Sequence, residues 1–485
     1  MNLRDANLFH QQSYINGQWC DADNRSTLAV NNPADNNALG SVPNMGEAET
    51  RRAIHAADAA LPAWRAKTGK ERGAILRRWH DLILANIDDL AEIMTLEQGK
   101  PLSEARGEIQ YALSFVDWFS EEAKRVYGDV LPQTRSDQRL LALRQPIGVC
   151  AAITAWNFPS ALVTRKVSPA LAAGCTVVLK PAELTPYSAL ALAELAHRAG
   201  FPAGVLNIVT GNPVAIGKEL TSSSIVKKLT FTGSTPTGRL LMAQCASNIK
   251  KLSLELGGNA PFIVFEDGDI DQAVDGLMIS KFRNAGQTCV CANRILVHES
   301  IAEVFSSKLK LKVEALKVGN GMTPDVVQGP LINRAAVDKV ERLVADAIDK
   351  GAKLITGGST HPLGGLFYTP TLLTGITGAM AIAHEEIFGP VLAITTFRDE
   401  EEAIRQANDS PSGLAAYFYA DSMERIWRVM EKLEYGMVGV NTGMISNEVG
   451  PFGGIKESGV GREGSRYGME EFMELKYVCM SGRMQ

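Results

Sequence analysis

The feature that most constrains the fold is a regular alternation of short apolar runs with longer segments rich in alanine and leucine, which begins at Ile147. The short runs have the length of buried strands, and the longer segments have the length of helices. Strands and helices that alternate at this spacing predict parallel βαβ units. Ligands of such folds bind at the carboxyl ends of the strands, near the point where the strand order reverses. The apolar runs lie at 149–154, 176–179, 205–209, 228–231 and 252–254, and the helical stretches at 160–173, 186–199, 213–221 and 236–247.

The segments around this region complete an α/β pattern. Residues 45–126 read as helix, and a second alternating set of strands and helices follows from about 260 to 440. Two extended segments, 139–145 and 471–480, stand outside the alternation. We therefore predict an α/β fold with two doubly wound parallel-sheet domains and a small additional β element.

Charge and cysteine usage exclude several classes of protein. The 485 residues carry a formal net charge of −5, so no broad basic surface is expected for nucleic acid or an anionic membrane. The seven cysteines form no disulfide framework, and neither CxxC nor HExxH occurs, so we expect no metal site. The segment Met1–Asn16 lacks the pattern of a signal peptide, and two prolines interrupt the longest uncharged stretch, Gln145–Thr164. We expect a cytoplasmic protein without a nucleic-acid or membrane partner.

The strongest functional signal is a thiol on a small polar loop, Phe282–Cys289. A free cysteine usually packs as a small inert hydrophobe. In Leu254–Gly258, however, Glu255 directly follows an apolar strand, where a buried carboxylate is costly unless it has a role. A thiol nucleophile and a carboxylate base are sufficient for acyl chemistry without a histidine. Asn157, in Trp156–Pro159 at a strand end, offers an amide donor for an oxyanion.

Two glycine patterns that suggest phosphate binding are rejected. Gly459–Gly464 matches GxGxxG, but no strand precedes it, so we predict a turn. Gly211–Lys218 resembles a P-loop with one extra residue, and Glu219 stands where a Ser or Thr would bind magnesium.

Seven segments occur in one order along the chain: Trp156–Pro159, Lys180–Glu183, Phe231–Ser234, Glu255–Gly258, Phe282–Cys289, Glu386–Pro390 and Pro451–Gly454. In this order they resemble the NAD(P)-dependent aldehyde dehydrogenase superfamily over essentially the whole chain. Ser253–Phe262 and Cys289-Val290-Cys291 are similar, more narrowly, to succinate-semialdehyde dehydrogenases.

The resemblance implies the catalytic roles. Cys289 is expected to attack the aldehyde as a thiolate, and Asn157 together with the Cys289 backbone N–H to hold the oxyanion. Hydride then passes to the nicotinamide, and Glu255 activates the water that hydrolyses the thioester.

The resemblance also implies a cofactor site. Lys180 and Glu183 are expected at the adenosine ribose, where a Glu183 carboxylate would repel a 2′-phosphate; we therefore predict NAD, with NADP as the alternative. The other cofactor-binding residues would be Gly233 and Ser234 at the pyrophosphate on a helix N-terminus, Glu386 at the nicotinamide ribose, and Leu256 and Trp156 at the nicotinamide.

The predicted substrate is a short aldehyde with a distal carboxylate. Two guanidinium groups, those of Arg165 and Arg283, would suit this carboxylate because the planar fork binds it in a bidentate way, and Ser446 could add a hydroxyl donor. Succinate semialdehyde is the first choice and glutarate semialdehyde the second. A CoA-acylating dehydrogenase is disfavoured because it needs no base such as Glu255, and a cysteine hydrolase because no histidine lies in a matching motif. A structural or binding role without catalysis is the remaining alternative.

The resemblance implies a division of the chain. Residues 1–128 and 147–256 would form the cofactor-binding domain and 257–465 the catalytic domain. The oligomerisation strands, 129–146 and 466–485, would pair across subunits in a homodimer or homotetramer.

Cys291 is a candidate redox partner of Cys289. If the segment is extended, residues i and i+2 project to the same side, at the long end of the disulfide range. The alternative is that Cys291 only packs in the core.

Overall fold

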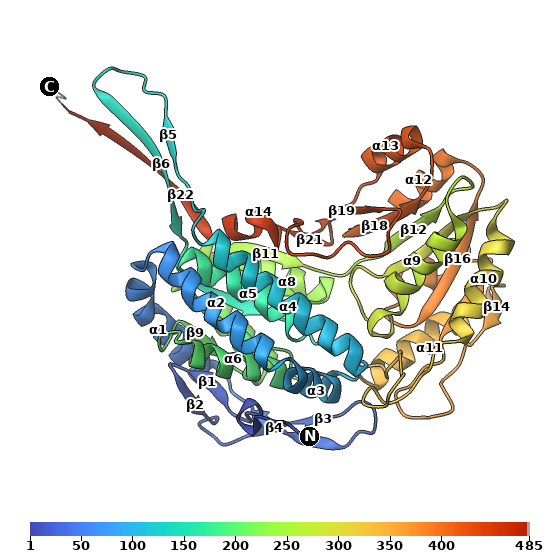
Figure 1. The fold of residues 1–485 in the computed structure, drawn as a ribbon, viewed down its shortest axis with the longest axis horizontal. Coiled ribbons are helices and arrows are strands. Elements are labelled where there is room, and N and C mark those ends of the chain that lie inside the picture. The colour runs from blue at the N-terminus through green and yellow to red at the C-terminus, as the bar shows by residue number, and fades with distance from the viewer. Residues whose placement is uncertain (483–485) are drawn as a thin grey trace.

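The computed structural model describes residues 1–482, which form two lobes and one projecting sheet (Figure 1). The first lobe contains an eight-stranded sheet whose five central strands, β9-β8-β7-β10-β11, are parallel. In chain order these strands run 3-2-1-4-5, so the order reverses between β7 and β10, which is a topological switch point. The strands are β1 (Ser13–Ile15), β2 (Gln18–Cys20), β7 (Val149–Ile153), β8 (Thr176–Lys180), β9 (Leu206–Ile208), β10 (Val226–Thr232), β11 (Lys251–Glu255) and β21 (Gly459–Val460).

Helices cover both faces of this sheet. Successive side chains of a strand point to opposite faces, and here the side chains on both faces are apolar and are buried by helices. On β7, Cys150 and Ala152 pack in the cluster with α2 to α6, whereas Val149 and Ala151 pack with α1, α7 and α8. The region read as helix over 45–126 consists of four helices. The bounds are α1 (Glu47–Arg65), α2 (Gly69–Ala85), α3 (Ile87–Gln98), α4 (Leu102–Glu122), α5 (Ala161–Ala173), α6 (Tyr187–Ala199), α7 (Pro213–Ser222) and α8 (Thr235–Cys245).

The second lobe contains a seven-stranded sheet in the order β14-β15-β16-β13-β12-β18-β19, in which only β14 runs antiparallel to its neighbour. Two parallel sheets covered by helices confirm the predicted α/β class. The strands are β12 (Ala260–Val264), β13 (Ala292–His298), β14 (Lys353–Thr356), β15 (Thr371–Thr374), β16 (Val391–Phe397), β18 (Ala415–Tyr419) and β19 (Met437–Val440); the helices are α9 (Ile270–Phe282), α10 (Ala302–Glu314), α11 (Arg334–Asp349), α12 (Glu400–Asn408) and α13 (Met423–Lys432). Within residues 1–482, no helix is both long and apolar enough to cross a membrane.

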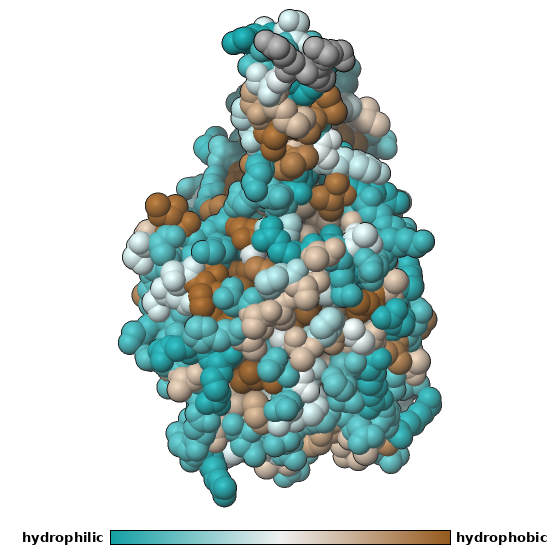
Figure 2. All heavy atoms as spheres, turned by 90° about the vertical axis from the view of Figure 1, so that its left-hand side faces the viewer, coloured by the Kyte–Doolittle hydropathy of each residue, from teal (hydrophilic) through white to brown (hydrophobic). Residues whose placement is uncertain are grey.

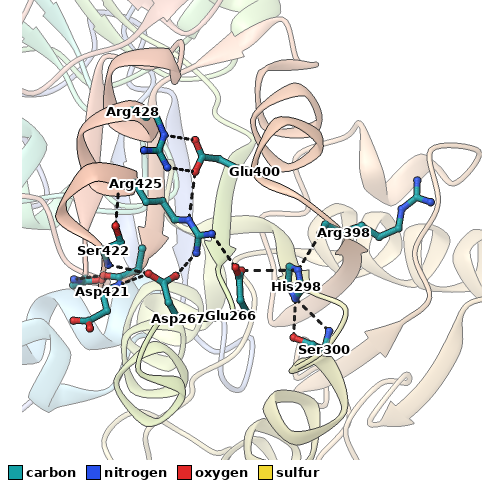
Figure 3. A network of polar contacts seen from close by, with 12 residues as sticks. Glu266, Asp267, His298, Ser300, Arg398, Glu400, Asp421, Ser422, Arg425 and Arg428 are labelled. Carbon is teal, nitrogen blue, oxygen red and sulfur yellow. Dashed lines mark hydrogen bonds and ion pairs between the residues drawn. The ribbon is translucent and has the colours of Figure 1, made fainter.

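Polar side chains fill the switch point of the second sheet, at the carboxyl ends of β12 and β18 (Figure 3). Arg425 on α13 donates to Glu266 at 2.8 Å, to Glu400 at 3.3 Å and to Asp267. Asp267 in turn accepts the backbone N–H of Ser422 at 2.8 Å. The network fixes α12 and α13 against the sheet at the position where a ligand binds in many α/β folds.

The third sheet projects from the first lobe and consists of β5 (Asp129–Leu131), β6 (Gln138–Pro146) and β22 (Met473–Ser481). β22 pairs antiparallel with β6 over nine residues, so the two segments predicted to pair across subunits pair with each other within one chain. The exposed large apolar residues of this sheet include Val130, Leu475 and Tyr477. Figure 2 shows apolar side chains on the surface near the top of the molecule, where the sheet projects. Residues 483–485, the end of the predicted oligomerisation segment, lie outside the described residues.

β21 lies in the range predicted for the catalytic domain, yet it pairs with β11 of the first sheet.

Candidate active site

The Cys289 loop makes a sharp reversal between α9 and β13. Asn284, Ala285 and Gly286 follow each other with φ of 53°, 53° and 76° in the left-handed region. A Cβ on Gly286 would lie 2.3 Å from the carbonyl oxygen of Gly389, so a side chain does not fit there. This turn presents Cys289, which is half-buried, toward the first lobe.

Cys289 lines a narrow cavity between the lobes. The structure brings five predicted residues into its wall: Cys289, Asn157, Arg165, Arg283 and Ser446. Sequence reasoning assigned no role to the other lining residues, which are Tyr111, Phe158, Ala161, Leu162, Thr232, Thr288, Val290 and Phe452. Phe158, Thr288 and Phe452 fell inside the family segments, but Tyr111 lies on α4, outside every motif.

Burial is the dominant influence on the Cys289 thiol. It raises the pKa of Cys289 to about 12, although the Arg165 guanidinium acts in the opposite direction. The thiol is therefore the resting form at neutral pH, and its proton must leave before attack.

Asn157 is placed as an amide donor. It follows β7 at the carboxyl edge of the first sheet, and its Nδ2 donates to the carbonyl oxygen of Gln287 at 3.1 Å. An amide carries two N–H donors, so a second one remains for an oxygen in the cavity. Gln287 is two residues before Cys289, which explains how this bond holds Asn157 next to the thiol.

Glu255 ends β11 and is not among the residues that line the cavity. It is buried, and within residues 1–482 neither carboxylate oxygen has a hydrogen-bond partner. Burial, reinforced by the negative charge of Glu463, raises the pKa of Glu255 well above its usual value. Its charge also raises the pKa of Cys289, so the two groups interact. A carboxyl group with a raised pKa suits a general base near neutral pH.

The two predicted substrate arginines differ in their partners. Arg165 is buried, and its Nε lies 2.5 Å from a carboxylate oxygen of Glu463. Arg283 has no carboxylate within ion-pair distance among residues 1–482; its guanidinium lies 5.2 Å from the centre of the Phe158 ring. Both Arg283 and Ser446 line the cavity. Arg283 is therefore free to meet an anionic ligand, whereas Arg165 shares the Glu463 carboxylate with Lys166.

The predicted adenosine and pyrophosphate residues gather at the switch point of the first sheet. Lys180 ends β8, and its ammonium forms an ion pair with Glu183. Ser234 precedes α8, but its side chain accepts no bond from the helix backbone. Pro236 has no N–H, so the N–H groups of Thr235 and Thr237 are those of the first turn that stay available for an anion. Gly233 donates its N–H to the carbonyl oxygen of Glu255 at 3.1 Å, and this hydrogen bond connects the turn before α8 to the end of β11.

The predicted nicotinamide residues come from both lobes. Glu386 accepts the N–H of Gly258 at 3.0 Å, and burial raises its pKa to about 7. Leu256 is buried against α8, and the Trp156 ring meets Phe388 edge-on at 5.6 Å. Trp156 and Leu256 thus follow strands of the first lobe, β7 and β11, and Glu386 belongs to the second lobe.

Cys291 does not have the predicted backbone. Its N–H donates to the carbonyl oxygen of Thr288 at 3.1 Å, so Cys289 and Cys291 lie in a turn and not in an extended segment. The Cys291 thiol is buried, 3.7 Å from the Lys281 ammonium. All seven cysteines are free thiols in this structure.

The chain is similar in sequence and fold to proteins that are named as aldehyde dehydrogenases. A family model described as "Aldehyde dehydrogenase family" matches residues 19–478. A glutarate-semialdehyde dehydrogenase of Pseudomonas aeruginosa is 61% identical over 482 residues, which cover 99% of this chain and 100% of that protein. A succinate-semialdehyde dehydrogenase (NADP(+)) of Escherichia coli is 60% identical over 480 residues, which cover 99% and 100%. The crystal structure of succinate-semialdehyde dehydrogenase from Burkholderia pseudomallei matches with a TM-score of 0.99 and 59% identity, covering 99% of this chain and 100% of that chain.

Proposed function

The chain belongs to the aldehyde dehydrogenase family, and on that premise we propose that it oxidises succinate semialdehyde, or a similar short carboxylated aldehyde, to the dicarboxylate with NAD(P). The observation that carries the substrate class is Arg283, which lines the Cys289 cavity without a carboxylate partner among residues 1–482. Glutarate semialdehyde is the second candidate, because relatives named for each substrate are 61% and 60% identical to this chain.

The reaction follows from the side chains around Cys289. The Cys289 thiol first releases its proton to solvent water. The thiolate then attacks the aldehyde carbon and forms a thiohemiacetal, while Asn157 Nδ2 and the Cys289 N–H hold the oxyanion. When bound, the nicotinamide dinucleotide supplies the hydride acceptor. Loss of hydride leaves a thioester on Cys289. Glu255 then takes a proton from the water that hydrolyses this thioester. Arg283 and Ser446 bind the distal carboxylate and so orient the aldehyde toward the thiol.

The residues that would hold the dinucleotide fit its chemistry. The free N–H groups at the start of α8 suit the pyrophosphate, and Lys180 with Glu183 offers a donor and an acceptor for ribose hydroxyls. The Glu183 carboxylate would repel a 2′-phosphate, so NAD is the expected cofactor, although the Escherichia coli relative is named with NADP(+).

The Glu183→Ser variant tests the cofactor assignment. It removes the repelling charge and frees the Lys180 ammonium, so kcat/KM for NADP relative to NAD should rise. Glu47→Ser is the control, because Glu47 is a half-exposed acid on the first turn of α1 that also pairs with a lysine, Lys218. An unchanged cofactor ratio in Glu183→Ser would refute the electrostatic argument.

The assembly and location are also proposals. The edges of the projecting sheet and its exposed apolar side chains support a homodimer or homotetramer, and the seven free cysteines support a cytoplasmic location. The first lobe, as the cofactor-binding domain, and the second lobe, as the catalytic domain, supply opposite walls of the site.

The substrate assignment is tested by following reduced nicotinamide with both semialdehydes and with uncharged aldehydes of equal length. Arg283→Gln should raise KM for the semialdehydes about 10–150-fold, because a hydrogen bond to a charged group contributes about 1.5–3 kcal/mol. KM for the uncharged aldehydes should change little, and Arg239→Gln, an exposed arginine paired with Glu457, is the control. Equal KM values for charged and uncharged aldehydes in the wild type, or a requirement for CoA, would contradict the proposal.

A further inference from the structure

One face of α4 contacts both loops that carry the proposed catalytic groups. Glu104, Glu108 and Tyr111 are spaced i, i+4 and i+7 and therefore lie on the same side of the helix. Glu104 accepts the backbone N–H of Asn284, in the Cys289 loop, at 2.8 Å. Glu108 accepts the N–H groups of Ser160 and Ala161, next to the Asn157 loop, at 2.9 and 3.1 Å.

A buried lysine extends this contact to Asn157 itself. Lys100, in the turn before α4, forms an ion pair with Glu108, and both side chains are only 1% exposed. The Lys100 ammonium also donates to the backbone carbonyl oxygen of Asn157 at 2.8 Å and lies 4.2 Å from the centre of the Phe158 ring. Removing two charges from water is costly, so a buried pair is weak evidence for a purely stabilising role. The second hydrogen bond of the Lys100 ammonium, to the Asn157 carbonyl oxygen, indicates that the pair holds the Asn157 loop in place.

The two loops are also tied directly to each other. Asn284 Nδ2 donates to the same carbonyl oxygen of Asn157 at 2.9 Å, and Asn157 Nδ2 donates to Gln287 at 3.1 Å. Asn284 holds a left-handed backbone, a strained conformation that persists only where the surroundings enforce it. The Glu104 carboxylate, bonded to the Asn284 N–H, is one group that enforces it.

We propose that Lys100, Glu104 and Glu108 are positioning residues that fix the oxyanion donor Asn157 relative to the nucleophile Cys289. Lys100 and Glu108 hold the Asn157 loop, and Glu104 holds the Cys289 loop. The inference rests on the proposed aldehyde oxidation, and none of the three residues lines the cavity.

The double variant Lys100→Met/Glu108→Gln isolates the Asn157 loop. The glutamine oxygen can still accept the N–H groups of Ser160 and Ala161, and no unpaired charge stays buried, but the donor to Asn157 is lost. We expect kcat with succinate semialdehyde to fall about 10–100-fold with KM within about threefold of wild type, because a misplacement of 1 Å can cost 10²-fold. Alkylation of Cys289 by iodoacetamide, measured without aldehyde, should keep its wild-type rate.

The Glu104 variants isolate the Cys289 loop. Glu104→Leu should change the Cys289 alkylation rate more than threefold, and Glu104→Gln should restore it because its amide oxygen can accept the Asn284 N–H. Arg106→Gln, on the exposed side of α4, should leave both rates unchanged. Hydrogen exchange of residues 155–165 should accelerate in the Lys100 double variant, and that of 280–290 in Glu104→Leu.

Two results would overturn the proposal: wild-type kcat in a folded double variant, or a parallel loss of kcat and alkylation in all variants, which indicates general destabilisation. A wild-type enzyme that oxidises no aldehyde would refute the proposed function instead. The alkylation and exchange measurements need no substrate, so they would still decide whether the three residues position the loops.

Discussion

At the scale of single residues, burial raises the pKa of both proposed reacting groups, with different consequences for each. It keeps the Cys289 thiol protonated at neutral pH, and it gives the Glu255 carboxyl a pKa well above its usual value. For the Cys289 thiol, the raised pKa lowers the fraction of thiolate, which is the nucleophilic form. For a carboxylate it creates a base that is strong enough to take a proton from water. The site therefore depends on deprotonation of both groups.

The Glu255→Gln variant should separate the two half-reactions. We expect one rapid equivalent of reduced nicotinamide and then little turnover, because the thioester forms but no base activates water. In the wild type, hydrolysis should rise with pH as Glu255 loses its proton, since a raised carboxyl pKa means that the basic form appears only at higher pH. Stopped-flow absorbance over a pH series measures both effects. Cys289→Ala should lack even the burst, and steady turnover near wild type in Glu255→Gln would exclude Glu255 as the base.

Cys291 gives a second prediction at this scale. It shares a turn with Cys289, so a bond between the two thiols would remove the nucleophile reversibly, and strain in so short a loop would make that bond easy to reduce. We expect peroxide to inactivate the enzyme and dithiothreitol to restore it, and Cys291→Ala to lose the recovery. Cys479→Ala, an exposed cysteine on β22, is the control. Peroxide-treated enzyme that keeps both thiols by mass would show that Cys291 only packs.

At the scale of elements, the Arg425 network connects α12 and α13 to the second sheet (Figure 3). Burial raises the pKa of Glu266 and Asp267, but hydrogen bonds from Arg425 and the Ser422 N–H outweigh it, so the pKa of both carboxyls is lowered. A lowered pKa stabilises the fold above the ordinary carboxyl range, and this contribution is lost as the pH falls below about 4.

Arg425→Met should therefore destabilise the protein in a pH-dependent way. We expect a loss of about 1–2 kcal/mol at pH 7, because three carboxylates lose a shared cation that is partly exposed to solvent. The difference from wild type should shrink as the pH falls below about 4. Thermal unfolding measured from pH 2 to pH 8 checks this, with Arg428→Met as the milder control, because within residues 1–482 this half-exposed arginine pairs with Glu400 alone. A pH-independent difference would show that lost packing, and not charge, explains the effect.

The elements also show what the sequence could predict. β7 to β11 and α5 to α8 lie within two residues of the predicted segments, because buried strands and amphipathic helices leave local patterns. The pairing of Arg165 with Glu463, and of β6 with β22, joins residues about 300 or more positions apart, and no local pattern encodes such partners. The turn at Cys289–Cys291 was predicted as an extended segment for a different reason. The residue types of a small polar loop do not determine its backbone dihedral angles. Tyr111 was missed because its helix carries no motif.

At the scale of the whole molecule, the proposed site exists only where the two lobes meet. Asn157, Arg165 and Tyr111 come from the first lobe, and Cys289 and Arg283 come from the second. A cavity divided in this way lets the first sheet hold a dinucleotide while the second lobe carries the thiol. The positions of the two lobes, and not any single loop, therefore set the distance across which hydride would move.

The projecting sheet leads to the last prediction, which concerns assembly. β22 is an edge strand of nine residues, and it exposes Leu475 and Tyr477 on one face of the sheet. An edge of this length with apolar side chains is a template for another chain, so we expect a dimer or tetramer at micromolar concentration. Leu475→Glu combined with Tyr477→Glu should lower the mass measured by light scattering, because each substitution places a charge in the contact. Glu474→Lys, whose side chain alternates to the other face, should leave the mass unchanged. A fully active wild-type monomer at that concentration would disprove the predicted assembly.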